Sequence, residues 1–169
     1  LTHYALSYVI SSRVVDRKTS LVVALAGLLP DVDALLGFHR WATHSIVLAA
    51  SAMLPLITFA YAKKRRGVLK FLALATLLYM IHIVLDVFTS PTPLLWPLTS
   101  NAYAVTVDVE GVVTSTGFAP TIGVKVVSEA TNFGKKHVVE GPIATPLGVA
   151  TSIAVLIAVL LELFKGSKH

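Results

Sequence analysis

The chain has 169 residues, of which 55% are hydrophobic and 14% charged, and its mean hydropathy is +0.78. Because a soluble domain carries about 25% charged residues, this composition argues against an ordinary soluble domain and predicts an integral membrane protein. The lack of cysteine excludes disulfides and thiolate metal sites. The net charge of +5 does not predict nucleic-acid binding, since the densest basic run, Lys63 to Arg66, separates two long apolar stretches. Glutamine is absent and asparagine is scarce, a bias typical of thermophiles.

The expected helices begin with a short hairpin. Its arms are residues 4–15 and 21–29, and its charged tip at residues 16–18 lies in the cytoplasm. Each arm is short for a complete membrane span. Three longer apolar stretches follow and predict spans: Ile46–Ala62, Phe71–Phe88 and Ile143–Phe164. The predicted fold is therefore mainly α, a polytopic transmembrane bundle of about four to five helices.

A different pattern fills the interval between the second and third long stretches. Val105, Val107 and Val109 alternate with polar residues, as in a strand. Residues 112–116 and 122–127 could pair with it, which predicts a β-rich insertion of two to four strands. The expected organisation is residues 1–98 as a helical region, 99–141 as the β-rich insertion and 142–169 as a C-terminal transmembrane helix.

Basic residues predict the orientation. If the loops at residues 13–18, 63–70 and 165–168 face the cytoplasm, ten of the 14 basic residues lie inside. The chain is then a multi-pass protein of the cell membrane, with the β-rich insertion outside.

Ionisable residues within apolar segments are costly and mark functional sites. At 1.5 Å per helical residue, His3, Asp31, His44 and His82 all lie roughly 20–28 Å from the basic loops. His82 and Asp86 are four residues apart on one helix face. We expect Thr43 to cap the helix that follows it, and His39 to lie on the preceding loop. Imidazole and carboxylate together suit Zn²⁺, with Mn²⁺ and Fe²⁺ as alternatives.

Each candidate also has a structural interpretation. Asp31 or Asp33 alone could be a helix cap, and His82 alone a hydrogen-bonded packing residue. His3 could be an ordinary terminal residue, and Arg40 with Trp41 an interface anchor. Their combination at one depth favours a metal site on the extracytoplasmic side. The candidate metal ligands are His3, Asp31, Asp33, His39, His44, His82 and Asp86, enough for one or two ions.

Three elements of the sequence resemble a known family. They are LPDVD at residues 29–33, HRWATHS at 39–45 and HIVLD at 82–86, preceded by Thr2-His3 and followed by the segment near Trp96. Together they resemble the LexA-regulated (YdjM-like), membrane-bound metal-dependent hydrolase family, over roughly residues 1–98. One departure is the stretch from Ser90 to Pro93, where a glycine is expected.

The resemblance implies hydrolysis, and the residues favour metal-activated water acting on a phosphoester of a membrane lipid, in the manner of a phospholipase-like phosphoesterase. Arg40 could clamp a phosphate, and Asp31, Asp33 or Asp86 could serve as the base. No nucleic-acid partner is expected, and the oligomeric state stays open. The alternative is a non-catalytic metal-binding transporter, sensor or scaffold. The scarcity of polar residues within Ile46–Ala62 favours the enzyme over a transporter.

Overall fold

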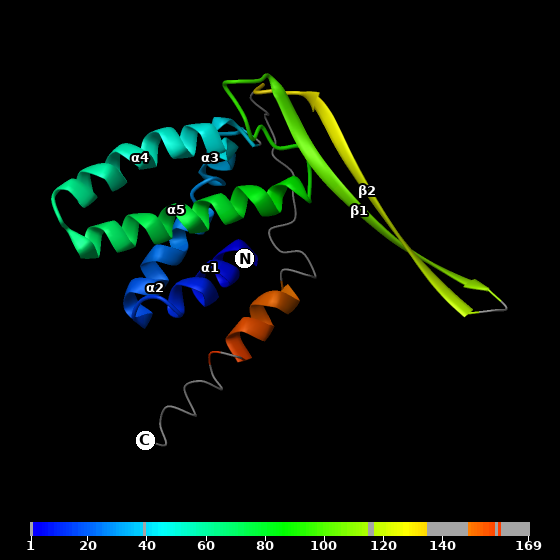
Figure 1. Cartoon of the computed structure of the whole chain (residues 1–169), viewed down its shortest axis with the longest axis horizontal. Helices are drawn as coiled ribbons and strands as arrows, with labels where there is room; N and C mark the ends of the chain where they lie inside the picture. The colour runs from blue at the N-terminus through cyan, green and yellow to red at the C-terminus, as the bar shows by residue number, and fades with distance from the viewer. Residues whose placement is uncertain (1, 39, 115–116, 135–148, 158, 160–169) are drawn as a thin grey trace, which may run out of the picture.

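The computed structural model describes residues 2–38, 40–114, 117–134, 149–157 and 159. The helices of the first 87 residues lie together, and a long β-hairpin extends away from them (Figure 1). The end of α5 nearest the hairpin is the end that carries the candidate metal ligands.

The N-terminal helical hairpin is present. Helix α1 (Thr2–Ser12) is joined by a short turn to α2 (Arg17–Ala24), which continues into the 3-10 helix η1 (Leu25–Leu28). Asp16 begins α2, where its side chain accepts from the backbone amides of Lys18 and Thr19, a standard cap for unpaired helix amides. With 11 and 8 residues, α1 and α2 are each too short to cross a bilayer.

The two long apolar helices lie antiparallel, side by side (Figure 1). Helix α4 (Ile46–Ala62) has the bounds that the sequence predicts and contains Pro55, and α5 (Arg66–Val87) begins five residues earlier than expected. Many of their apolar side chains are exposed, among them Leu54 and Phe59 on α4 and Leu77 on α5. Such surfaces suit a lipid environment.

The predicted bundle of four to five membrane spans is wrong. Within the described residues, α5 is the single helix long and apolar enough to cross a membrane, with a mean hydropathy of 2.2 over its best window. Helix α4 has 17 residues and is shorter, and the remaining helices before it are much shorter still. Most of the predicted C-terminal span, Ile143–Phe164, lies outside the described residues, although residues 149–157 are helical.

The N-terminal hairpin is tightly packed within itself and against α5. Gly27 is so close to α1 that an added Cβ would lie 2.0 Å from the Ser7 Oγ, and small residues let helices approach closely in membrane proteins. Against α5, Val23 of α2 packs with Leu74 and Leu78 in a small apolar core. The backbone carbonyl of Gly27 lies 2.6 Å from His82 Nδ1, so η1 is next to the face of α5 that carries His82.

The β-rich insertion is one antiparallel hairpin of β1 (Asn101–Thr114) and β2 (Gly117–Ala130). The two segments expected on either side of Gly111 form a single strand, because Gly111 pairs with Pro120 within the ladder. Thr92 forms an isolated bridge with Tyr103, which ties the loop after α5 to the base of the hairpin. The hairpin therefore starts beside the candidate metal ligands and leads away from them.

Candidate metal centre

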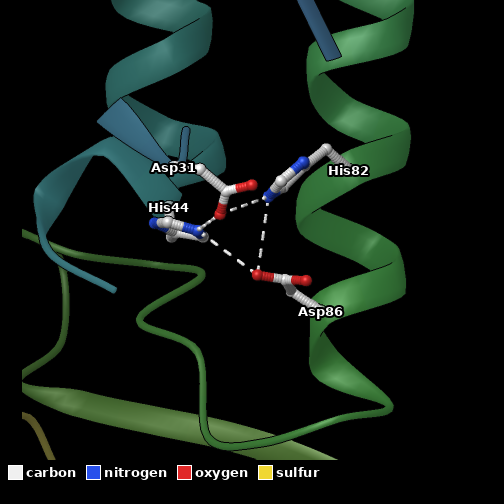
Figure 2. A group of neighbouring side chains, drawn as sticks. All are labelled: Asp31, His44, His82 and Asp86. Atoms are coloured by element: carbon white, nitrogen blue, oxygen red, sulfur yellow. Dashed lines mark ion pairs between the residues drawn. The ribbon is translucent and has the colours of Figure 1, made fainter. Parts of the chain in front are cut away.

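Four side chains from three segments of the chain converge on one point (Figure 2). Asp31 precedes the short helix α3 (Val32–Leu35), and His44 ends the 3-10 helix η2 (Ala42–His44). His82 and Asp86 stand one turn apart near the end of α5. One ligand atom from each of the four lies within 4.8 Å of the other three.

The distances within this cluster fit a single small cation. The Oδ2 atom of Asp86 lies 3.3 Å from His44 Nε2 and 3.5 Å from His82 Nε2. The Oδ1 atom of Asp31 lies 3.4 Å from His82 Nε2 and 3.8 Å from His44 Nε2. Ligands placed tetrahedrally about 2.0–2.1 Å from a zinc ion stand about 3.3–3.4 Å apart. Both Nε2 atoms are buried without a hydrogen-bond partner, which is costly unless an ion or another group meets them.

The far nitrogen of each imidazole is held by a group behind it. His82 Nδ1 lies 2.6 Å from the backbone carbonyl of Gly27, and His44 Nδ1 lies 3.2 Å from Asp33 Oδ2. A carbonyl or carboxylate in this position accepts a hydrogen bond from Nδ1–H. The proton of the neutral imidazole then stays on Nδ1, and Nε2 keeps a free lone pair. That arrangement is the usual support for a metal-ligating histidine.

Asp33 is therefore placed behind the cluster and not within it. Its Oδ2 accepts from the Trp41 amide at 2.6 Å and from the Thr43 hydroxyl at 2.9 Å, besides contacting His44. Burial opposes ionisation, but these donors outweigh it and lower the pKa of Asp33. Asp33 is an orienting carboxylate for His44.

Asp31 differs from the other three members in its exposure. Its side chain is 51% exposed, whereas that of Asp86 is 6% exposed. It occupies the cap position of α3 but makes no capping hydrogen bond, so its carboxylate is free to face the cluster. Burial raises its pKa, but contacts with His44 and His82 lower it by more, and the net direction is downward. The cluster is thus closed by α5 and open on the side of Asp31.

The electrostatic environment of His44 favours a positive charge. Burial alone would lower its pKa, but the carboxylates of Asp31, Asp33 and Asp86 outweigh that effect and raise the pKa to about 10. When both imidazoles are neutral, the carboxylates of Asp31, Asp33 and Asp86 outnumber the one nearby guanidinium, that of Arg40, and the site is negative. A divalent cation is the natural partner of such a site.

His3 joins the cluster from α1. Its Nε2 lies 3.3 Å from Asp86 Oδ1, and its ring packs on His82 with 3.9 Å between centroids. It therefore contacts the oxygen of Asp86 that points away from His44 and His82. His3 supports two members of the cluster from behind.

Arg40 contacts the Asp86 carboxylate at the oxygen that His3 does not contact. Its Nη2 lies 3.4 Å from Asp86 Oδ2, and it donates 2.6 Å to the Thr89 hydroxyl. Its Nη1 donates to the backbone carbonyls of Asp86 and Ser90 and to the Thr92 hydroxyl. Arg40 also has φ 53, a backbone conformation that non-glycine residues rarely adopt. In this structure the guanidinium of Arg40 is engaged by Asp86 and by the loop after α5.

Other expectations near the site need correction or fall outside the structure. Thr43 does not cap the next helix: Ser45 does, accepting from the Leu48 amide at 3.3 Å. The Thr43 hydroxyl is used by Asp33 instead. His39, a predicted ligand, lies outside the described residues. The stretch from Ser90 to Pro93, where a glycine is expected, contains Thr92, which pairs with Tyr103.

The fold and the cluster define a helical protein with a His/Asp site that could hold a metal ion, at one end of the described helix that is long and apolar enough to span a membrane. The chain belongs to the YdjM inner membrane protein family, whose sequence model matches residues 1–165. This confirms the family resemblance and extends it beyond the 98 residues that carry the motifs. No curated protein matches the chain, and no solved structure matches it.

Two supporting groups escaped the sequence analysis. The carbonyl of Gly27 holds His82, and the Tyr79 hydroxyl donates to the backbone carbonyl of Thr43. A glycine within an apolar stretch is a signal for close backbone approach, and Gly27 carries that signal. A backbone carbonyl gives no signal of its own, because every residue has one.

Proposed function

We propose that this protein is a membrane-embedded metal-dependent hydrolase that cleaves a phosphoester of a membrane lipid. The observation that carries the proposal is the pair of buried, unpartnered Nε2 atoms of His44 and His82 facing the carboxylates of Asp31 and Asp86. Buried polar atoms without partners are rare and call for an explanation. A divalent cation, Zn²⁺ first and Mn²⁺ or Fe²⁺ next, would meet both Nε2 atoms and the Asp86 carboxylate together.

The residues divide into ligands and a base by their burial. His44, His82 and Asp86 are buried and would hold one ion, a three-residue set that leaves a position for water. When bound, the ion would lower the pKa of that water and neutralise charge on a phosphoryl oxygen. Asp31 is the exposed carboxylate beside these ligands, and its Oδ1 is placed to take a proton from the attacking water.

The remaining polar residues keep the ligands in place. Asp33 orients His44, while Arg40 and His3 hold the two oxygens of Asp86 from opposite sides. Fixing a metal ligand through its outer contacts is as important as the ligand itself. The supporting residues come from α1, from α3 and from the loop between α3 and η2, so the site depends on several parts of the helical region.

We place the cluster on the extracytoplasmic side of the membrane. The opposite end of α5 follows a run of four basic residues, Lys63 to Arg66, and basic loops remain in the cytoplasm. Lipid headgroups of the outer leaflet are then the first phosphoesters that reach Asp31. This position supports a lipid phosphoester as substrate.

A second candidate is a non-catalytic metal site, and one observation favours it. If Asp31 is also a ligand, the ion has four protein ligands, the closed arrangement of structural zinc sites. Such a site would hold α3, η2 and α5 together without chemistry. This candidate includes the sensor and scaffold roles.

The replacement of Asp31 by Asn distinguishes the two candidates. If Asp31 is the base, Asp31→Asn keeps the metal and loses about 10²–10⁴ in rate; if Asp31 is a structural ligand, the variant loses metal. Purified protein would be loaded with Zn²⁺ or Mn²⁺ and offered phospholipids and lipid pyrophosphates in detergent, with and without chelator. Metal-loaded wild-type protein that releases no product from any of these lipids would favour the non-catalytic candidate.

A further inference from the structure

An apolar groove runs between α4 and α5 and ends beside the metal cluster. Its volume is about 590 Å³, within the range of small-molecule sites. Small side chains, Ala49 and Ala52 among them, hollow it out on the α4 side. The residues that line it are Trp41, Ala42, Thr43, Leu48, Ala49, Ala52, Met53, Thr76, Tyr79 and Trp96.

The surroundings of the groove indicate what fills it. Helix α5 is the spanning helix, and exposed apolar side chains flank the groove on both helices, so the medium around it is lipid. Trp41 and Trp96 line the groove near the start of α4, and tryptophan is enriched at the level of lipid headgroups. The groove follows α4 from Leu48 to Met53, roughly 7.5 Å at 1.5 Å per residue. An apolar space of this volume, beginning at the level of the two tryptophans, suits part of an acyl chain.

The groove and the metal cluster are continuous through two residues. Thr43 lines the groove, and its hydroxyl donates to Asp33, which supports His44. Tyr79 lines the groove from α5 and donates to the carbonyl of Thr43. Tyr79 and Asp86 are seven residues apart, close to two full turns, so they share one face of α5. A chain lying in the groove would therefore place its headgroup beside the cluster.

We propose that this groove binds one acyl chain of a membrane lipid, with the headgroup directed at the metal centre. Binding does not depend on hydrolysis, but the identification of that lipid as the substrate rests on the proposed function. The groove then selects for lipids with at least one unbranched chain. Met53 and Thr76 line the end of the groove farthest from the two tryptophans, so their position limits the length of acyl chain that the groove can bind.

A larger side chain in the groove tests the proposal. Ala52 lines the groove and is exposed, so Ala52→Trp fills the space without displacing a buried residue. Ala73 is exposed on α5 and does not line the groove, so Ala73→Trp is the matched control. The probe is phosphatidylglycerol with a diazirine at the end of one acyl chain, photolysed with the protein in vesicles, followed by mass spectrometry of the labelled peptides.

Wild-type protein and Ala73→Trp should be labelled mainly at groove residues from Leu48 to Met53 and at Thr76. Ala52→Trp should show at least tenfold less label there, with unchanged metal content. If Ala52→Trp has lost its metal and is misfolded, Met53→Trp replaces it in the same comparison. Equal labelling in the groove variant and its control would overturn the proposal. Wild-type labelling that is spread evenly over the outer surface would also overturn it. A change from dimer to monomer in Ala52→Trp would do so as well, because it would show that a second copy of the chain fills the groove.

The test of the acyl-chain site can fail or succeed independently of the test of hydrolysis. Asp86→Asn should lose metal and keep groove labelling, because Asp86 does not line the groove. Groove labelling without hydrolysis of any lipid would retain the acyl site and refute the enzyme. If Ala52→Trp hydrolyses lipid as fast as wild type and the groove of wild type is not labelled, the hydrolase proposal stands and the acyl-chain site is refuted.

Discussion

Replacing Asp33 by Asn should weaken metal binding about tenfold without abolishing it. Asp33 Oδ2 contacts the Trp41 amide, the Thr43 hydroxyl and His44 Nδ1, at 2.6, 2.9 and 3.2 Å. Asparagine keeps an acceptor oxygen but loses the charge. A hydrogen bond to a charged group contributes about 1.5–3 kcal/mol and a neutral one about 0.5–1.5 kcal/mol. The difference of roughly 1–1.5 kcal/mol corresponds to about 5–13-fold, near the lower end of the usual effect of losing an outer-shell partner.

The assay is competition for Zn²⁺ against a chelator of known affinity, with the protein in detergent. Asp108→Asn is the control, because Asp108 pairs with the exposed Lys125 at 3.1 Å on the distant hairpin. The control should bind metal as the wild type does. If Asp33→Asn binds within twofold of wild type, Asp33 does not support His44. If it binds no metal at all, Asp33 is itself a ligand and the cluster has been assigned wrongly.

Three further predictions follow from the structure. Gly27→Ala should destabilise the protein by roughly 1–3 kcal/mol, because its Cβ would lie 2.0 Å from the Ser7 Oγ; Gly67→Ala, with nothing within 4 Å, should not lower the unfolding temperature. Metal-free protein should lose stability as pH rises from about 6.5 toward 10, because folding raises the pKa of His44 from 6.5 to about 10 and so stabilises its charged form. Metal binding requires His44 to release its proton, so the protein should bind the metal ion more tightly over the same pH range. Thermal unfolding with and without metal at several pH values measures both trends. Single cysteines at Gly67 and Thr121, in a chain without cysteine, should be labelled from opposite sides of sealed cells, and labelling from one side would refute the orientation.

The length of the apolar stretches and the charge pattern predicted much of the helical region. Uncharged sequence between His44 and Lys63 defines α4, and the charged turn before Lys18 defines the break between α1 and α2. The same reasoning brought His3, Asp31, His44 and His82 to one depth, and the structure brings these residues together. Depth along a helix follows from residue spacing alone, which a sequence contains.

The rest depended on information that residue spacing does not contain. The number of spans was overestimated: the predicted span Ile46–Ala62 is a helix of only 17 residues, and most of Ile143–Phe164 lies outside the described residues. The roles of Asp33 and Arg40 depend on the direction of each side chain, which the loop between α3 and η2 decides. Asp33 and Asp31 are two residues apart, but Asp33 points toward the Trp41 amide and Asp31 toward the cluster.

The metal content of purified protein is the most direct test of the central claim. Elemental analysis would be applied to wild type, His82→Ala and Asp108→Asn after expression with Zn²⁺ and Mn²⁺ and removal of free ions. We predict close to one divalent ion per chain in wild type and Asp108→Asn, and almost none in His82→Ala. Wild-type protein without metal, or His82→Ala with the metal content of wild type, would contradict the account.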